Sequence, residues 1–527
     1  MIIILDFGSQ YTQLIARRIR ELNVYCEIYP YNSEEYKTKI SDIGGVIFSG
    51  GPDSVYQKDA ARISVEEVKF LVSNNIPILG ICYGMQLLVD LFGGVVSKGN
   101  VHEYGFSKIV VSKESMLFKG LIKRVGRENF TVWMSHGDTA RKLPSEFKSV
   151  AFTENNLIAA IESVKKNIYG LQFHPEVKHT QYGTEVLRNF VFEICKEKPN
   201  WTMGNFIEIS TKDIANKVGD NYAICALSGG VDSSVAATLV YKSIGKRLHC
   251  VFVDNGLLRL GEKERIKKVF IDVFGSSYVK KNIHIVNAED VFLKRLKNVS
   301  DPEKKRKIIG KTFIEVFSSV SEQIQQKIGQ RIKFLVQGTL YPDVIESVSV
   351  KGPSRTIKTH HNVGGLPKKL KFSLVEPLRF LFKDEVRRLG RQLGLSEEIL
   401  SRQPFPGPGL AVRVIGPVEK EKLRVLKLAD KIIEEEIRNA GLYTKIWQSF
   451  GVLLPVKTVG IMGDMRTYEN VLVLRAVESQ DAMTADWVKL PYELLNRISN
   501  RIINEVRGIN RVVYDISSKP PATIEWE

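Results

Sequence analysis

Short strand-like apolar runs alternate with helix-like stretches along most of this 527-residue sequence. The first runs are Ile2–Asp6, Gly45–Ser49 and Pro77–Cys82, and the stretches between them, Gln10–Leu22 and Ala60–Ser73, have helical periodicity. This alternation is typical of a parallel sheet, because strands that point the same way need a helical crossover between them. The sequence therefore predicts an α/β fold with helices covering the strands.

The alternation restarts after an interruption, which predicts a second sheet. The first domain is completed by strands at Lys108–Val111 and Ile168–Phe173 and by a helix at Thr184–Lys196, before the polar segment Lys196–Asn205. Beyond it, strands are expected at Ala223–Leu227, Leu248–Val253 and Lys333–Gln337. We therefore predict α/β domains over residues 1–198 and 204–400.

A small α+β domain is predicted over residues 401–527. The loop-rich segment 352–367 precedes this domain, and a second one, Gln403–Gly409, lies at its start. The second segment has three prolines and two glycines in seven residues, which neither a helix nor a strand can accommodate. Helices are expected at Val418–Asn439 and Tyr492–Val506, and strands at Thr458–Met462 and Val471–Ala476.

Hydrophobic residues make up 43% of the chain, enough for large cores. Apolar runs such as Ile76–Cys82 are far shorter than the roughly 18 residues that a membrane span needs, so no membrane association is expected. The five cysteines are odd in number and lack CxxC spacing, which favours free thiols in a reducing cytoplasm: Cys26, Cys82, Cys195, Cys225 and Cys250.

The net charge of +17 suits either nucleic acid or phosphorylated small molecules, and charge alone does not choose between them. The densest basic stretch, Lys294–Lys311, contains four consecutive cations at 304–307. Such a run is more often a solvated helix face than a binding site.

Cys82 stands where a buried strand turns sharply into a helix, within Gly80-Ile81-Cys82-Tyr83-Gly84-Met85-Gln86. Flanking glycines permit a strained elbow, and a helix N-terminus favours the thiolate over the thiol. His174 ends another predicted strand, and Glu176 follows two residues later to fix the imidazole tautomer. Backbone N–H groups of Gly51 and Tyr83 are the candidates for stabilising a tetrahedral oxyanion.

Each of these motifs is common alone, since a lone buried cysteine is usually inert core. In this order, the Gly50-Gly51-Pro52 loop, the cysteine elbow and His174-Pro175-Glu176 resemble the class I glutamine amidotransferases over roughly the first 195 residues. That resemblance implies that Cys82, His174 and Glu176 form a catalytic triad that releases ammonia from glutamine.

A second motif follows the strand Ala223–Leu227 and opens a helix expected at Val235–Ser243. Its glycines, hydroxyls and successive N–H groups are suited to cradling phosphate: Ser228, Gly229, Gly230, Val231, Asp232, Ser233 and Ser234. No lysine follows the glycines, so this is not the loop that grips a transferable γ-phosphate. An aspartate in such a cradle would repel phosphate unless Mg²⁺ lay between them, which makes Asp232 a candidate metal ligand.

The motif resembles the SGGxDS loop of ATP-dependent ligases that cleave ATP between the α- and β-phosphates. In that family, the position of Asp254, at the end of the next strand, neighbours the adenine. As a bare sequence, Asp254-Asn255-Gly256 is an ordinary turn more often than not. Acceptors used by such ligases include XMP, deamido-NAD, aspartate, argininosuccinate precursors and tRNA uridines.

Pairing this loop with a glutaminase narrows the choice, because ammonia must be the nucleophile. The chain resembles the GMP synthetase family along essentially its whole length, most specifically in the tail Lys519-Pro520-Pro521-Ala522-Thr523-Ile524-Glu525-Trp526-Glu527. The resemblance implies a cytoplasmic enzyme, homodimeric through its C-terminal domain, that adenylates XMP and aminates it with ammonia from glutamine. It implies ATP and Mg²⁺, with no tightly bound organic cofactor and no nucleic-acid partner.

The same resemblance suggests Lys383 for the ATP phosphates, and Arg306, Lys519 and Glu525 for XMP. Arg306 and Lys519 are equally plausible as solvated surface charges, and His360-His361 resembles a lid segment rather than a metal site. One departure is Gln403, where the family pattern leads us to expect histidine, and this leaves the local packing in question.

Two other interpretations of the sequence account for less of it. An RNA-binding or RNA-modifying protein is suggested by the +17 charge, but no cysteine pair is placed to carry sulfur and no stacked-aromatic RNA motif is present. A regulatory homologue without glutaminase activity is disfavoured because the triad is intact.

Overall fold

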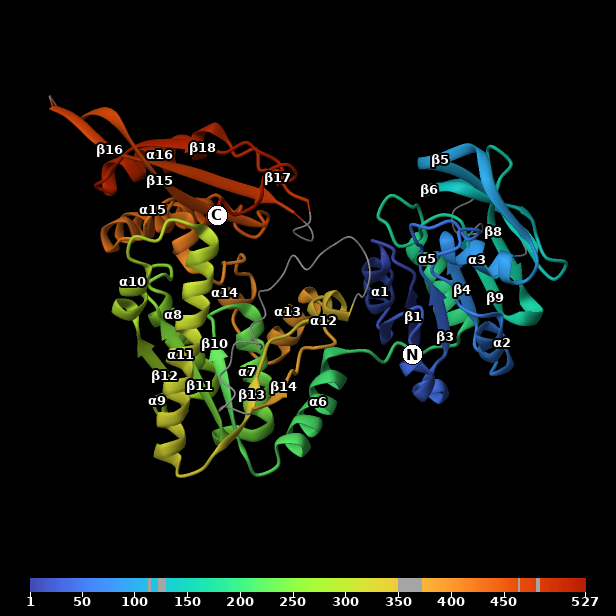
Figure 1. Cartoon of the computed structure of the whole chain (residues 1–527), viewed down its shortest axis with the longest axis horizontal. Helices are drawn as coiled ribbons and strands as arrows, with labels where there is room; N and C mark the ends of the chain where they lie inside the picture. The colour runs from blue at the N-terminus through green and yellow to red at the C-terminus, as the bar shows by residue number, and fades with distance from the viewer. Residues whose placement is uncertain (112–114, 122–128, 349–371, 463–464, 480–483) are drawn as a thin grey trace. The chain divides into compact units, whose positions relative to one another are not determined.

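The computed structural model describes the chain except for residues 112–114, 122–128, 349–371, 463–464 and 480–483 (Figure 1). The predicted lid segment with His360-His361 lies outside the described residues. Two compact units are present: Met1–Phe206 with helix α12 (Tyr341–Val348), and Ile207–Leu340 with the described residues from 372 onward. Among the described helices, none combines the length and the apolar character that crossing a membrane requires.

A nine-stranded mixed sheet forms the centre of the first unit, in the order β2-β1-β3-β4-β9-β8-β7-β5-β6. Strands β1 to β4 and β9 run parallel, and β8, β7, β5 and β6 continue the sheet in antiparallel fashion. The strands are β1 (Ile2–Asp6), β2 (Cys26–Pro30), β3 (Gly45–Phe48), β4 (Ile78–Ile81), β5 (Val95–Val111), β6 (Asn129–Lys142), β7 (Lys148–Thr153), β8 (Ile158–Ser163) and β9 (Ile168–Leu171).

The short helices of this unit pack against the parallel strands through buried apolar side chains. They are α1 (Thr12–Glu21), η1 (Glu35–Asp42), α2 (Val65–Ser73), α3 (Tyr83–Leu91), η2 (Val164–Lys166), α5 (Gly183–Arg188) and the π-helical turn η3 (Asn189–Ile194). Helix α12 is tied to the same unit because the Ile28 N–H donates a hydrogen bond to the Tyr341 hydroxyl.

A fully parallel five-stranded sheet, ordered β12-β11-β10-β13-β14, begins the second unit. Its strands are β10 (Tyr222–Leu227), β11 (Leu248–Asp254), β12 (Ile283–Asn287), β13 (Ile332–Val336) and β14 (Ser373–Val375). From β10 the chain adds β11 and β12 on one side of the sheet and then β13 and β14 on the other. The segment after β10 therefore lies at the topological switch point where such sheets bind ligands.

The helices around this sheet are α6 (Met203–Val218), α7 (Val231–Ile244), η4 (Gly245–Arg247), α8 (Glu262–Phe274), α9 (Ser276–Asn282), α10 (Glu289–Leu296), α11 (Pro302–Ile328), α13 (Lys383–Gln392) and α14 (Glu397–Leu400). A smaller sheet follows, in which β15 (Gln448–Met462), β16 (Met465–Glu478) and β17 (Asp486–Trp487) are neighbours and β18 (Ile509–Tyr514) pairs with β16. It packs with η5 (Gly409–Arg413), α15 (Lys420–Asn439) and α16 (Tyr492–Glu505).

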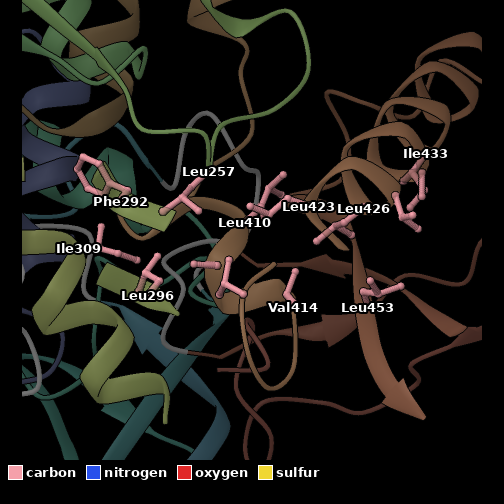
Figure 2. Close-up of a cluster of buried hydrophobic side chains, with 14 of the residues drawn as sticks. Leu257, Phe292, Leu296, Ile309, Leu410, Val414, Leu423, Leu426, Ile433 and Leu453 are labelled. Atoms are coloured by element: carbon pink, nitrogen blue, oxygen red, sulfur yellow. The ribbon is translucent and has the colours of Figure 1, made fainter. Parts of the chain in front are cut away.

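One continuous hydrophobic core runs through the second unit (Figure 2). Leu410 and Val414, from η5 and the residue after it, lie between side chains of the parallel sheet's helices, such as Phe292, and those of the smaller sheet, such as Leu453. Full burial of such side chains is worth about 1.5–3 kcal/mol each, so η5 is firmly embedded. The predicted α/β fold with a small α+β region at the end is confirmed, whereas the three domain limits stay predictions.

Several elements differ in extent from the prediction. Helix α2 begins at Val65, five residues later than expected, because Ser64 caps it by accepting a hydrogen bond from the Glu67 N–H. The expected strand Lys108–Val111 is only the end of the 17-residue β5, and β15 and β16 form a longer hairpin than the predicted strands. Strands β2, β6, β7, β8, β12, β14, β17 and β18 were not predicted.

Candidate active sites

Cys82 lies at a sharp turn between β4 and α3. Its backbone has φ 52° and ψ −107°, a strained conformation for a residue with a side chain. A Cβ atom on Gly80 would lie 2.5 Å from the Gly84 carbonyl carbon, and one on Gly84 would lie 2.5 Å from the Phe48 carbonyl oxygen. Only glycine therefore fits at these two positions, and the turn places the Cys82 sulfur at the N-terminal end of α3.

His174 reaches the same sheet edge because β9 runs parallel to β4, with Leu171 opposite Ile81. Its Nδ1 lies 2.7 Å from Glu176 Oε1, and both side chains are buried. Burial by itself lowers the pKa of His174, but the Glu176 carboxylate and hydrogen bonds with Cys82 and Glu176 hold that pKa well above its ordinary value. The arrangement favours an imidazolium next to the sulfur.

The loop after β3 packs tightly against these residues. A Cβ atom on Gly50 would lie 3.3 Å from His174 Cε1, and one on Gly51 would lie 2.8 Å from the Phe7 carbonyl oxygen and 3.2 Å from the Tyr83 ring. Tyr83 is the first residue of α3, so its N–H belongs to the turn whose donors lack intrahelical acceptors. Both candidate oxyanion donors thus lie on segments that pack around the triad.

Gln172 is a buried residue of this site that the sequence analysis missed. Its Nε2 lies 3.7 Å from Cys82 Sγ, and its Oε1 accepts a hydrogen bond of 3.1 Å from Gln86 Nε2. The Gln86 amide also donates to the Asp138 carbonyl at 2.9 Å, so Gln172 is held with an N–H toward the sulfur. Aligning the ends of the two predicted strands would have placed Gln172 beside Cys82.

The phosphate-loop candidate starts where β10 ends, at the switch point of the parallel sheet. Gly229 has φ +76°, and Ser233 Oγ accepts hydrogen bonds from the Ser228 N–H at 3.2 Å and shares one with Ser228 Oγ at 3.0 Å. Helix α7 begins at Val231, four residues before the predicted start, so Asp232, Ser233 and Ser234 lie in its first turn rather than in a loop. The helix start adds further N–H donors to the cradle.

Lys383 lies at this loop. The first residue of α13 is Lys383, and its Nζ is 2.6 Å from each carboxylate oxygen of Asp232. Gly338 also packs against Asp232, because a Cβ atom there would lie 3.0 Å from the Asp232 carbonyl carbon. The structure therefore brings together two predicted ATP-site residues 151 positions apart in the sequence.

Arg402 contacts the backbone of this loop and was not predicted as part of the site. It donates to the Gly229 carbonyl at 2.5 Å and makes two 2.6 Å contacts with the Glu262 carboxylate, and both charged side chains are buried. Asp254 ends β11, the neighbour of β10, and its Oδ1 accepts a hydrogen bond of 3.2 Å from the Gly256 N–H. Asp254 thus shapes a turn at the same strand edge as the phosphate loop.

Arginine side chains bind the C-terminal tail. The Arg413 guanidinium contacts both Glu525 oxygens, at 3.0 and 2.9 Å, and Gln448 Nε2 donates to Glu525 at 2.6 Å. Arg306 reaches the Glu527 carbonyl oxygen at 2.5 Å. Arg306 therefore lies beside the tail that carries Glu525.

Lys519, the remaining predicted tail residue, is joined through its main chain to Ala485 by hydrogen bonds of 2.7 and 3.0 Å. Gln403, the departure from the family pattern, is buried and well bonded. It accepts hydrogen bonds from the N–H and hydroxyl of Ser449 and donates to the Tyr443 carbonyl at 3.1 Å, so local packing is intact.

Among the described residues, no group of three or more His, Cys, Asp or Glu side chains is arranged to hold a metal ion. The single carboxylate of Asp232 fits a Mg²⁺ ion that is held mainly by phosphate oxygens and water.

Comparisons with known proteins cover both ends of the chain. The family described as "Glutamine amidotransferase class-I" matches residues 3–194, and the family described as "GMP synthase C terminal domain" matches residues 435–526. A protein of Chlorobium chlorochromatii named GMP synthase (glutamine-hydrolyzing) is 58% identical, over 100% of this chain and 99% of that relative. Proteins of the same name from Pelodictyon phaeoclathratiforme and Brachyspira hyodysenteriae are 57% and 55% identical, with the same coverage.

Proposed function

This chain belongs to the family of glutamine-hydrolysing GMP synthases, and on that premise we propose how its own residues perform the reaction. It releases ammonia from glutamine, adenylates XMP with ATP and replaces the adenylate with ammonia, giving GMP, AMP and pyrophosphate. One observation carries the assignment of residues: the buried Cys82, His174 and Glu176 converge at one sheet edge. A hydroxyl-lined helix start at the switch point of the second sheet supports the synthetase half.

In the glutaminase reaction, the Cys82 thiolate attacks the carboxamide carbon, and the oxyanion accepts hydrogen bonds from the N–H groups of Gly51 and Tyr83. His174 donates its proton to the departing nitrogen, so that ammonia leaves and a thioester remains. Neutral His174 then takes a proton from water as the water attacks the thioester, which returns glutamate and the imidazolium. Glu176 fixes the tautomer throughout, since its oxygen faces Nδ1.

In the synthetase reaction, the N–H groups and hydroxyls of residues 228–234 hold the departing pyrophosphate. The XMP oxygen at C2 attacks the α-phosphorus, and the bond between the α- and β-phosphates breaks. Ammonia then displaces AMP, which is a far better leaving group than a carbonyl oxygen. Asp254 lies at the same strand edge and is proposed to neighbour the adenine.

Lys383 and Asp232 are proposed to exchange partners when ATP binds. Their mutual ion pair would give way to contacts from Lys383 to phosphate oxygens, and Asp232 would then hold a Mg²⁺ ion. That ion would neutralise charge on the phosphates. For XMP, we propose that Arg306 and Lys519 bind the phosphate and that Glu525 receives donors of the base or ribose.

A product assay tests the whole proposal. Incubating the protein with XMP, Mg-ATP and glutamine is expected to yield GMP, AMP and pyrophosphate. Cys82→Ala should abolish glutamine-driven but not ammonium-driven synthesis, whereas Asp232→Ala should abolish both. Recovery of ADP and orthophosphate would show that the proposed chemistry of the loop is wrong, and equal loss in Cys82→Ala would argue against two separate sites.

We also propose a cytoplasmic homodimer. The five cysteines are free thiols, as expected in a reducing compartment. On the β15–β16 hairpin, Val459 lies directly opposite Tyr468, and these two side chains and Ile461 are 50%, 59% and 76% exposed. An apolar hairpin face of this kind is suited to pairing with a second copy.

An RNA-binding role remains the alternative from a different class. It rests on the +17 charge, but part of that charge lies in buried cations that face protein acceptors, such as Lys305, Arg413 and Arg475. The role predicts RNA affinity that falls steeply with salt, and absence of such binding would remove it.

A further inference from the structure

We propose that Lys305 is a positioning residue for nucleotide binding, which fixes the C-terminal tail against η5 so that Arg306 and Glu525 face XMP together. The proposal rests on the proposed XMP role of those two residues. Lys305 itself touches no substrate in this scheme.

The Lys305 side chain is fully buried, unlike its exposed neighbours Lys304 and Lys307 on α11. Its Nζ donates to the carbonyl oxygens of Ala411 at 3.1 Å and Val414 at 2.8 Å, and to the Glu527 carboxylate at 2.5 Å. An ammonium has three donors, so each has an acceptor and the group is fully satisfied. The basic run is therefore not a uniformly solvated face.

The three acceptors come from two segments distant in the sequence. Ala411 belongs to η5 and Val414 follows it, in the continuous core of the second unit, whereas Glu527 belongs to the tail. Burial lowers the pKa of Lys305, an effect that the Glu527 carboxylate opposes. A buried charge of this kind adds little to stability compared with an apolar side chain, but it fixes geometry because each bond is directional.

Two of the three residues proposed to bind XMP, Arg306 and Glu525, are attached to the same junction. Arg306, the next residue on α11, donates to the main-chain oxygen of Glu527, whose side chain Lys305 binds. Arg413, the last residue of η5, makes the two-pronged contact with Glu525. The adjacent cations Lys305 and Arg306 thus both bind Glu527, and Arg413 of η5 binds Glu525, two residues earlier in the tail.

Removing the Lys305 ammonium leaves two buried carbonyl oxygens and one carboxylate without their donor, which favours release of the tail. The loss is expected to weaken XMP binding specifically. Among the described residues, neither the phosphate loop nor Lys383 contacts Lys305 or the tail. The affinity for ATP should therefore change little when Lys305 is replaced.

The test compares Lys305→Met with Lys307→Met, which removes the same charge from an exposed position of the same helix. With ammonium as nitrogen donor, Lys305→Met should raise the KM for XMP about tenfold or more, while the KM for ATP stays within about twofold. Hydrogen exchange of the unliganded protein should be faster in the tail. Lys307→Met should match the unmodified protein in all three measurements.

Glu527→Gln keeps the helix and η5 intact and provides a second variant if Lys305→Met fails to fold. It should raise the KM for XMP in the same direction by a smaller factor. An unchanged KM for XMP, an equal rise in the KM for ATP, or unchanged exchange of the tail would overturn the inference. If the unmodified protein does not use XMP at all, the proposed function fails, and the exchange measurement still decides whether Lys305 holds the tail.

Discussion

The ammonium of Lys383 lies 2.6 Å from both carboxylate oxygens of Asp232, at the start of the helix that follows the phosphate loop. Both side chains are partly exposed, so the pair contributes little to stability. Its importance lies in holding a cation and a metal-seeking anion side by side at the place proposed for the ATP phosphates.

Lys383→Gln should therefore impair the synthetase reaction and spare the glutaminase. We expect the KM for ATP to rise roughly tenfold or more, because the charge-assisted contact to phosphate is lost. Steady-state assays with ammonium measure this effect. Arg388→Gln, which removes a charge from a similarly exposed position of the same helix that pairs with Asp384 rather than Asp232, is the control. An unchanged KM for ATP in Lys383→Gln would exclude the proposed role.

Glu176→Gln should move the alkaline limit of glutaminase activity to lower pH. Glu176 raises the pKa of His174, whereas burial lowers it, so removing the carboxylate lowers that pKa and the proton donor is lost sooner as pH rises. Because the pKa of His174 is raised in the folded state, its protonation contributes stability that is fully present below the unfolded-state pKa of about 6.5. This contribution is lost as pH rises through the folded-state pKa. A pH profile of kcat/KM for glutamine checks the shift, and identical alkaline limits would contradict it.

Gln172→Leu should make Cys82 less reactive. The substitution removes the amide N–H that lies 3.7 Å from the sulfur, so a thiolate there loses a donor. We expect alkylation by iodoacetamide to slow by roughly tenfold, with ammonium-driven GMP synthesis unchanged. Gln172→Glu keeps the size but adds negative charge, and it should slow alkylation further. Wild-type rates in both variants would show that Gln172 only fills space.

Arg402→Met should destabilise the second unit strongly. The change leaves buried Glu262 without its partner and the Gly229 carbonyl without a donor, at an expected cost of about 3–5 kcal/mol. Arg391→Met breaks the exposed Arg391–Glu397 pair and should cost less than about 1 kcal/mol. Urea unfolding of both variants compares the two, and equal losses would refute the difference in burial as the cause.

Ile461→Glu should weaken the proposed dimer. A charge on the exposed apolar face of the hairpin opposes its burial against a second copy. Sedimentation at several concentrations measures the monomer fraction. Ile209→Glu, on the exposed face of α6, is the matched control and should leave the association unchanged.

The sequence predicted seven of the ten parallel strands of the two larger sheets, because these segments carry their signals locally, but it did not predict β2, β12 and β14. Ile2–Asp6 was predicted to the residue, and so was the start of α16 at Tyr492. The long strand β5 was missed over most of its length, since its lysines, glycines and histidine are poor strand formers and its stability comes from pairing with β6.

Residues that act across long sequence separations were the least predictable. Cys82 and His174 were candidates because each follows the end of a predicted strand, whereas Gln172 and Arg402 make contacts that span 90 and 173 positions. Lys305 was hidden for another reason: it stands among exposed cations and differs from them only in the direction its side chain points. Composition cannot distinguish these neighbours, whereas the fold does.

The backbone conformation at Cys82 favours glycine for stability, whereas the proposed chemistry requires the cysteine thiol. Glycine would adopt that conformation without strain, so Cys82→Gly should raise the free energy of unfolding and abolish ammonia release from glutamine. The thiol at this position therefore comes at a cost in backbone strain, which its proposed role in releasing ammonia requires.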